Sequence, residues 1–344
     1  MRVAQSTLLG LGVLGLSAGL AAQEPSELTA ELSYKALKKW SFNLPNETWS
    51  DVKSGIPIAH QNGDSFEAHM DGLALALAVD TDGDGRTDKT VKGAKGYLVL
   101  RAKDKAGETM QYAVRFQAKD KAYQFATSGV MRGKLNGVAI MLIDQNNNGL
   151  YNEIGVDAMI VGKGDSASFL SRIVNLDDEL FEITVSADGK KIEATPFTGD
   201  VGKIDLESGF RASGKLVSAV VNSSDGKSSF EISSGETVVP AGDYTLAFGL
   251  VSKANESVNV RHGKMKTLTV DAGRTTSQKW GSEVMADFTF GHSGENVTIE
   301  PSALKYYGQS GEEYYAFQPM AKSPKFFVFD ERTEKLLKTG RFGT

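Results

Sequence analysis

The chain has 344 residues and a formal net charge of -5, and its length suggests about two domains, each with its own core. The acidic balance argues against nucleic acid and anionic lipid as partners and suits a protein that binds cations. Because the chain contains no cysteine, disulfides and a lipid-modified amino-terminal cysteine are both excluded.

The first residues have the pattern of a secretory signal. Arg2 supplies a single positive charge, residues 6–20 are uncharged and rich in Leu and Gly, and residues 21–23 read Ala-Ala-Gln. We therefore predict a signal peptide over residues 1–22 and a secreted, periplasmic or extracellular (cell-surface) protein. No later stretch reaches the roughly 20 apolar residues that a membrane-spanning helix needs, so we expect no membrane span.

Two loops rich in Asp, Asn and Gly are typical of calcium sites. They read DTDGDGRTD over residues 80–88 and DQNNNGLYN over residues 144–152. Positions 1, 3 and 5 place side-chain oxygens on one side of a turn, and the glycine at position 6 permits the sharp bend. The carbonyl at position 7 and the side chain at position 9 then close the site. The predicted ligands are Asp80, Asp82, Asp84, Arg86 and Asp88 in the first loop, and Asp144, Asn146, Asn148, Leu150 and Asn152 in the second.

Both loops resemble the metal-binding halves of EF-hands, dockerins and thrombospondin type 3 repeats, over about a dozen residues each. The resemblance implies Ca²⁺ as the cofactor. It ends at the twelfth position, where an EF-hand has a bidentate Glu and this chain has Val91 and Gly155. The apolar runs before the loops, residues 72–79 and 137–143, predict strands in place of entering helices.

A loop that follows a strand must find its last ligands elsewhere, and in the second loop Glu153 or Asp157 is well placed to supply one. The first loop carries more carboxylates than the Asn-rich second loop, so we expect unequal affinities. Without the bidentate Glu, we expect both loops to bind calcium weakly, with a Kd of roughly 10⁻⁴ to 10⁻³ M, as extracellular modules do. The alternative is that these Asp, Asn and Gly clusters are ordinary turns.

Composition and pattern predict an all-β fold. Apolar residues come in short runs separated by turn signals about every ten residues, as in β-sandwiches. We predict tandem antiparallel, immunoglobulin-like sandwiches: a calcium-loop domain over 23–198 and a domain over 199–344 that resembles immunoglobulin-like or transthyretin-like modules. Short helices are expected at 27–39 and 166–174. The clearest predicted strands are residues 97–101, 110–116, 181–185, 215–221, 243–248 and 325–329.

No complete catalytic motif is found in the sequence. Residues 209–215 nearly match a phosphate loop but lack the hydroxyl that would hold Mg²⁺. Residues 50–53 and 338–340 match two pieces of the penicillin-binding pattern, whose S-D-N piece is missing. The histidines lack zinc-site spacing and are expected on the surface. The four histidines are His60, His69, His262 and His292. On these grounds we predict that the protein is not an enzyme.

Aromatic pairs support a structural interpretation. Tyr306-Tyr307 and Tyr314-Tyr315 flank a turn, and in a hairpin some of them face each other across the strands. The alternative is a surface that stacks on sugar rings. Trp40 and Trp49 are expected to pin an irregular segment onto the core, and the acidic cluster at 177–179 is expected to be a turn.

These features favour a secreted calcium-binding structural or adhesive protein in which calcium stabilises strand connections. The alternative is a calcium-dependent carbohydrate-binding or substrate-recognition module, and a hydrolase with scattered acids is less favoured. The expected partners are extracellular polysaccharide or other surface proteins, with no nucleic acid. The oligomeric state is open.

Overall fold

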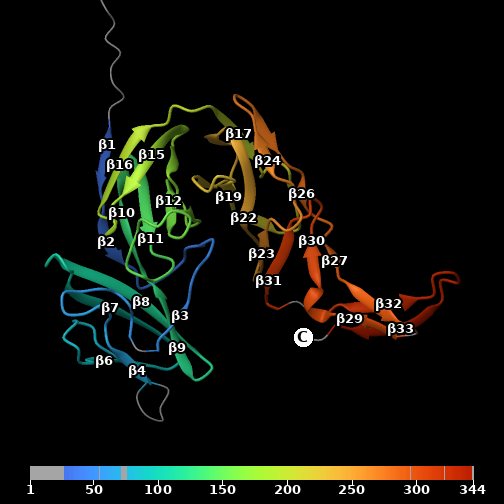
Figure 1. The fold of residues 1–344 in the computed structure, drawn as a ribbon, viewed down its shortest axis with the longest axis horizontal. Helices are drawn as coiled ribbons and strands as arrows, with labels where there is room; N and C mark the ends of the chain where they lie inside the picture. Colours follow the sequence, from blue (N-terminus) through green and yellow to red (C-terminus); the bar gives the residue numbers. More distant parts are fainter. Residues whose placement is uncertain (1–26, 54, 71–75, 295, 321, 343–344) are drawn as a thin grey trace, which may run out of the picture.

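The computed structural model describes residues 27–53, 55–70, 76–294, 296–320 and 322–342 (Figure 1). These residues form β-strands and one 3₁₀ turn, η1 (Pro301–Ala303), and they contain no α-helix. The predicted all-β class is therefore confirmed. No helix in these ranges is long and apolar enough to cross a membrane. The predicted signal peptide lies outside the described residues.

Two sheets enclose the first core, which includes the buried side chains of Leu142 and Ile192. Each sheet takes an edge strand from the amino-terminal segment, because β1 pairs with β16 and β2 pairs with β10. One sheet has the order β1 (Leu28–Glu31), β16 (Lys191–Pro196), β15 (Glu179–Val185), β14 (Ile173–Leu176). The other has the order β13 (Ser168–Phe169), β12 (Ala158–Val161), β11 (Val138–Ile143), β10 (Gly129–Leu135), β2 (Ser33–Ala36).

The two predicted helices are wrong. Residues 27–39 contain β1 and β2, and residues 166–174 contain β13 and the start of β14. Leu28, Ala30, Leu32 and Tyr34 alternate with polar residues at the period of a strand, and both Ala30 and Leu32 are buried. The alternation was therefore present in the sequence and outweighs the helix propensity of the Glu, Ala and Lys residues around it.

A second pair of sheets, in the lower left of Figure 1, carries the first Asp-rich loop. Its core includes Leu77, Leu100 and Phe125, which are fully buried. One sheet has the order β3 (Ser50–Asp51), β9 (Ala122–Thr127), β8 (Thr109–Lys119), β7 (Lys95–Lys103). The other has the order β4 (Ala68–Met70), β5 (Ala76–Val79), β6 (Lys89–Lys92).

The second half is built around one large sheet, which packs on two smaller ones around Trp280. The large sheet has the order β20 (Ser229–Glu231), β19 (Lys215–Ser223), β22 (Gly242–Lys253), β23 (Glu256–Arg261), β31 (Glu313–Gln318), β30 (Lys305–Tyr307), β27 (Met285–Asp287), and β24 (Leu268–Val270) also pairs with β22. The smaller sheets are β21 (Thr237–Pro240), β17 (Val201–Asp205), β25 (Thr275–Ser277), and β18 (Phe210–Arg211) with β26 (Trp280–Gly281).

Two pairs in this half depart from the predicted antiparallel arrangement, because β17 pairs with β25 and β18 pairs with β26 in parallel. Parallel neighbours need a long crossover, which the intervening strands of the large sheet supply. The two halves also touch, since Ile173 and Leu180 join the core of the second half. A parallel bridge between Ile173 and Ser228 adds to this contact.

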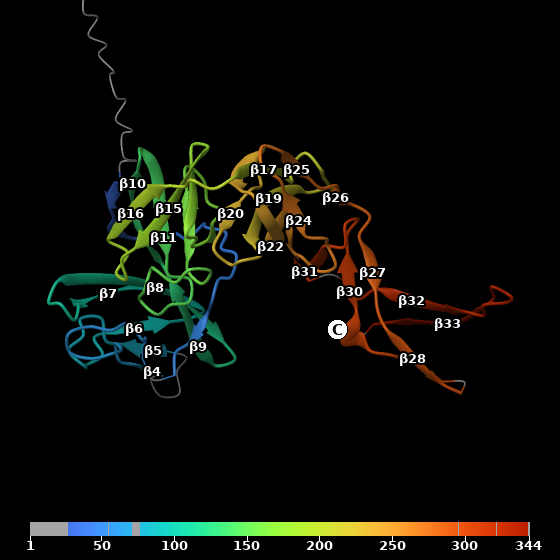
Figure 2. The ribbon, with the colours of Figure 1, turned by 45° about the horizontal axis from the view of Figure 1, so that its top comes forward.

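Two further hairpins project from the second half (Figure 2). They are β28 (Phe290–Ser293) with β29 (Asn296–Ile299), and β32 (Lys325–Phe329) with β33 (Leu336–Arg341). An aromatic cluster joins their bases, with ring centroids 5.2 Å apart for Phe288 and Phe342 and 5.5 Å apart for Phe326 and Phe342.

The strands predicted most clearly from the sequence are confirmed as β7, β8, β15, β19, β22 and β32. The tyrosine-rich segment forms the predicted hairpin, in which Tyr306 of β30 lies opposite Tyr314 of β31. The Arg115 guanidinium lies 4.5 Å from the ring centroid of Trp40 and 4.8 Å from that of Trp49, so the irregular segment contacts β8 through both rings. Trp40 also packs against a small core cluster, as predicted.

One histidine departs from its expected place on the surface. His60 is only 3% exposed, and its ring centroid lies 4.5 Å from that of Phe66. Its Nε2 lies 3.0 Å from the carbonyl oxygen of Ser65. The surface prediction is therefore wrong for His60, because residues on both sides of it, Ile58 and Phe66, belong to the second core.

Candidate metal centre

Each Asp-rich loop begins where a buried strand ends. Asp80 follows β5 and Asp144 follows β11, and both residues are buried. The glycines at the sixth positions, Gly85 and Gly149, have φ angles of 83° and 84°, which favour glycine. Both loops therefore make the predicted bend at the predicted residue.

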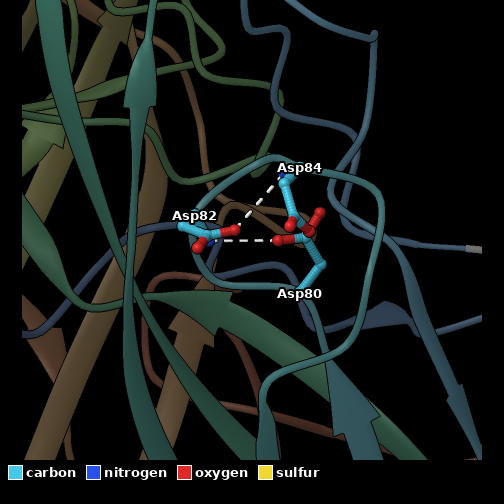
Figure 3. Close-up of side chains that lie close together, drawn as sticks. All are labelled: Asp80, Asp82 and Asp84. Carbon is cyan, nitrogen blue, oxygen red and sulfur yellow. Dashed lines mark hydrogen bonds between the residues drawn. The ribbon is translucent and has the colours of Figure 1, made fainter.

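In the first loop three carboxylates converge (Figure 3). Asp80, Asp82 and Asp84 each offer an oxygen that lies within 4.8 Å of the others. Asp80 Oδ1 accepts a hydrogen bond from the N–H of Gly83 at 2.8 Å, and its Oδ2 accepts one from the N–H of Gly85 at 2.9 Å. The buried carboxylate is therefore fixed, while Asp82 and Asp84 are exposed beside it.

The ninth residue of the first loop is held by other partners. The Asp88 carboxylate accepts hydrogen bonds from the N–H of Thr81 at 2.7 Å and from its hydroxyl at 2.9 Å. Lys89 Nζ lies 3.2 Å from Asp88 Oδ2. Arg86, whose carbonyl is a predicted ligand, donates its N–H to Asp84 Oδ1 at 2.8 Å. The structure thus groups three of the predicted residues and engages Asp88 elsewhere.

The second loop is organised around Asp144. Its Oδ1 accepts hydrogen bonds from the N–H groups of Asn147 at 2.7 Å and Asn148 at 3.1 Å. Its Oδ2 accepts one from the N–H of Gly149 at 2.6 Å and one from the hydroxyl of Tyr112, on β8, at 2.8 Å. Asp144 therefore plays the same part as Asp80 and also joins β11 to a strand of another sheet.

Two further carboxylates lie beside the second loop. Glu153 Oε2 accepts hydrogen bonds from the side-chain amides of Asn146 at 2.9 Å and Asn148 at 2.5 Å. The backbone N–H of Glu153 donates to Asp157 Oδ2 at 2.9 Å. Glu153 therefore binds the side-chain amides of Asn146 and Asn148 through its carboxylate, and it binds Asp157 through its backbone N–H.

Among the buried side-chain atoms that have no hydrogen-bond partner within the described part of the chain are Asn146 Oδ1 and Asp157 Oδ1, beside this loop. Buried polar atoms without a partner are rare in folded proteins, and each one calls for a ligand, an ion or a water. Because both atoms are acceptors, they suit a hard cation such as Ca²⁺, which takes oxygen ligands.

The pKa shifts of two carboxyls in this pocket also favour a bound cation. Burial raises the pKa of the Asp144 carboxyl to about 6. Burial, followed by the charges of Asp144 and Glu153, raises the pKa of the Asp157 carboxyl to about 8. Burial therefore disfavours the charged forms of Asp144 and Asp157, and a bound cation would favour them.

The side chains of the other two predicted residues of the second loop are exposed. Leu150 is 41% exposed and donates its N–H to Asn148 Oδ1 at 2.8 Å. Asn152 is exposed and lines a separate cleft of about 540 Å³ with Arg172 and Glu182. The ligand set drawn together by the structure is therefore Asp144, Asn146 and Asn148 with Glu153 and Asp157.

The contacts that anchor this loop could not be predicted from the sequence. Asn147 Oδ1 accepts the N–H of Thr127 at 2.7 Å, while its Nδ2 donates to the carbonyl of Thr48 at 2.9 Å and to Ser50 Oγ at 3.1 Å. Gln145 Oε1 accepts the N–H of Asn46 at 3.3 Å. The loop therefore joins β11, β9 and the segment that leads into β3.

Comparisons of the chain with protein-family models, with curated proteins and with solved structures find no match. Among the described residues, three acidic, His or Cys side chains come within metal-binding distance of one another in the first loop alone, and the carboxylates of the second loop do not form such a group. Since the first-loop group contains no His or Cys, its oxygen donors suit Ca²⁺ or Mg²⁺ better than zinc.

Proposed function

We propose that this chain is a secreted, calcium-stabilised structural or adhesive β protein and not an enzyme. In this proposal it consists of tandem immunoglobulin-like sandwiches that follow a cleaved signal peptide. Calcium in the second loop stabilises the strand connections of the first half. The observation that carries the proposal is the pair of buried, unpartnered oxygens on Asn146 and Asp157, next to the carboxylates of Asp144 and Glu153.

The oxygen donors around the second loop suit calcium. Calcium takes six to eight oxygen ligands, many of them carboxylates, amide oxygens and backbone carbonyls. Asp144, Asn146, Asn148, Glu153, Asp157 and the carbonyl of Leu150 together offer enough. The first loop is the second proposed site, and its exposed Asp82 and Asp84 suit a weaker, more hydrated ion.

A cation in the second loop would act on more than the loop itself. Asp144 and Asn147 bind groups on β8 and β9, and Gln145 binds the segment before β3. Ordering the loop therefore also orders the contact between two pairs of sheets. This is the behaviour expected of a structural ion, which binds the folded chain and stabilises it by mass action.

Thermal unfolding of the full chain tests the proposal. With the affinity expected above, 5 mM Ca²⁺ stabilises the fold by about 1–2 kcal/mol relative to a chelator, which raises Tm by about 2–8 °C. Asp157→Asn removes the buried carboxylate with the unpartnered oxygen and is expected to abolish most of this shift, whereas Asp80→Ala is expected to leave most of it. An equal Tm with calcium and with chelator in the unmodified chain would refute the proposal.

A second candidate function, calcium-dependent carbohydrate binding, is favoured by one cleft. It has a volume of about 400 Å³ and lies between residues 42–47 and the side chains of Phe248, Asn259 and Tyr315. Aromatic rings and amides are suited to contact sugars, which have apolar faces and hydroxyl groups. Asn46 and Thr48 both donate their N–H groups to Gln145, so the second loop holds one wall of the cleft.

A glycan array probed with the full chain tests this second function. Binding is expected with calcium and is expected to disappear both with chelator and in Tyr315→Ala. Absence of any calcium-dependent glycan signal would leave the structural role as the remaining proposal.

A further inference from the structure

The hairpin of β32 and β33 carries a local excess of positive charge. Residues 322–342, which we call the basic hairpin, contain six Lys or Arg residues and three Asp or Glu residues, an excess of three positive charges. Because the whole chain has a net charge of -5, the other residues together carry a net charge of -8. The basic hairpin, which projects from the second half, is therefore a positive surface on an otherwise acidic protein (Figure 2).

The positive charge of the basic hairpin lies along its strands. Lys322 precedes β32, Lys325 begins it, and Lys338 and Arg341 lie on β33. All four side chains are exposed, and neither strand contains an acidic residue. The three acidic residues are confined to the turn, residues 330–335, with the other two basic ones. A negatively charged ligand is therefore favoured beside the strands and not at the tip.

Two of these cations face each other without an acidic partner. Lys325 lies directly opposite Arg341 in the register of β32 and β33, and like charges in such a pair are destabilising. Among the ion pairs of the described residues, none involves Lys325 or Arg341. A carboxylate or sulfate placed between them would accept hydrogen bonds from both side chains and remove this repulsion.

Two exposed aromatic rings lie on the same face as this pair. Lys325, Phe327 and Phe329 are two residues apart along β32, so their side chains project from one face of the hairpin. Phe327 and Phe329 are 53% and 56% exposed, and their stacked rings have centroids 6.4 Å apart. Leu336, opposite Phe329, extends this apolar surface. The face therefore combines an apolar platform with unpaired positive charge.

We propose that the basic hairpin binds an acidic polysaccharide, whose charged groups are carboxylates or sulfates. The two exposed phenylalanine rings stack on the apolar faces of the sugars, and one acidic group lies between Lys325 and Arg341. Such a polymer repeats its charge along its length, so Lys322 and Lys338 add to the attraction. No predicted calcium ligand takes part, and the binding is therefore independent of calcium.

An anionic lipid surface fits the basic hairpin less well. The tip, which would reach the lipid first, carries all three acidic residues of the hairpin, and anionic headgroups repel them. Within the described residues the hairpin is two-stranded, so both of its edges carry unpaired backbone N–H and C=O groups. Sugar hydroxyls can bind these groups, whereas hydrocarbon cannot. A hydroxyl-rich polyanion therefore satisfies the cations, the rings and the edges together.

Affinity electrophoresis of the full chain in chelator tests the proposal. Migration through gels that contain polygalacturonate, heparin or neutral dextran is compared with migration through a gel that contains no polysaccharide. We expect one or both acidic polymers to retard the chain, dextran to leave it unretarded, and added salt to weaken the retardation by screening. The carboxylate polymer and the sulfate polymer distinguish the two kinds of acidic group.

Two double variants separate the charges from the rings. Lys325→Gln with Arg341→Gln removes the facing cations, and Phe327→Ala with Phe329→Ala removes the apolar platform. Each is expected to raise the Kd for the retarding polymer by about tenfold or more. Lys325→Arg with Arg341→Lys exchanges the two cations and is expected to bind normally, which separates loss of charge from misfolding.

Two matched controls lie outside the basic hairpin. Lys92→Gln with Lys95→Gln removes two exposed cations from another part of the surface, so it has the same net charge as the first variant. Phe290→Ala removes a ring that is 65% exposed on the other projecting hairpin, where residues 288–299 contain no Lys or Arg. Both controls are expected to bind like the unmodified chain.

Three outcomes would overturn the proposal. The first is an unmodified chain that neither acidic polymer retards. The second is retention by dextran as strong as by the acidic polymers, or double variants that bind as tightly as the controls. The third is cosedimentation with phosphatidylglycerol vesicles without retention by either polymer, which would make lipid the occupant. Because every measurement is made in chelator, failure here leaves the calcium proposal standing, and failure of the calcium proposal leaves this binding unchanged.

Discussion

Asp157 is the side chain that most clearly distinguishes a cation site from an ordinary turn. A plain Asx turn needs one carboxylate that accepts nearby N–H groups, a part that Asp144 already plays. Asp157 adds a second buried carboxylate whose Oδ1 has no donor among the described residues. A protein gains nothing from burying this extra charge unless a proton or a cation accompanies it.

This gives a prediction for stability against pH in chelator. Burial, aided by Asp144 and Glu153, raises the pKa of Asp157 in the folded chain from 3.8 to about 8. Between these values the folded chain holds a proton that the unfolded chain has lost, so the contribution to stability is full below about pH 4 and disappears as pH rises through about 8. Urea unfolding at pH 5 and pH 8 measures the change.

The comparison is with Asp157→Asn, which carries no titrating group at this position. We expect the unmodified chain to lose more stability than this variant between the two pH values in chelator. Millimolar calcium is expected to cancel the difference, because the bound cation replaces the proton. Parallel pH profiles for the two chains in chelator would show that Asp157 is not buried beside other carboxylates.

Tyr112 provides a second prediction at the same pocket. Its hydroxyl donates to Asp144 Oδ2 from a fully buried position at 2.8 Å. Tyr112→Phe leaves the ring in place and removes this bond to a carboxylate, which is expected to cost about 1.5–3 kcal/mol in urea unfolding. The control is Tyr244→Phe, which removes a bond to the neutral carbonyl of Pro240 and is expected to cost about 1 kcal/mol. Equal losses of stability in the two variants would contradict a charged Asp144 as the partner of Tyr112.

The second loop is a connector between sheets as well as a candidate site. Asn147→Ala removes three hydrogen bonds, to Thr127, Thr48 and Ser50, and leaves the N–H of Thr127 buried without a partner. We expect a loss of about 2–4 kcal/mol in urea unfolding. Asn136→Ala is the matched control, since Asn136 also has a positive φ but is exposed in the turn between β10 and β11. A similar loss in both would mean that backbone strain alone explains the effect.

Strands and turns could largely be predicted because their signals are local. Runs such as residues 110–116 and 243–248 alternate or are rich in β-branched and aromatic residues, and both form strands. Residues 27–39 and 166–174 form strands in place of the predicted helices because pairing with other strands outweighs local helix propensity. The parallel pairs, such as β17 with β25, could not be predicted, because they join segments far apart in sequence.

The candidate site was predictable in part. The bend at Gly149 and the turn around Asp144 follow from spacing within one loop. Asp157 could be suggested because it lies a few residues downstream. Tyr112 and Asn147 could not, since their contacts reach other sheets, and a lone Tyr or Asn in a sequence does not indicate a partner.

Across the molecule, the second loop lies in the first half, whereas the two projecting hairpins belong to the second half. Calcium is therefore expected to protect backbone amides of residues 43–50 and 122–157 from hydrogen exchange, and to leave residues 205–342 nearly unchanged. Mass spectrometry of the exchanged full chain, with calcium and with chelator, checks this. Uniform protection of both halves would contradict a local structural ion, and protection confined to the second half would place the ion elsewhere.

The central claim is that oxygens gathered after a buried strand hold a calcium ion. Isothermal titration calorimetry of calcium into the chelator-treated full chain tests it most directly. We predict saturable binding with an affinity of roughly 10⁻⁴ to 10⁻³ M or tighter, and loss of one bound ion per chain in Asp157→Asn. No heat of binding at millimolar calcium, or binding that Asp157→Asn leaves unchanged, would contradict the claim.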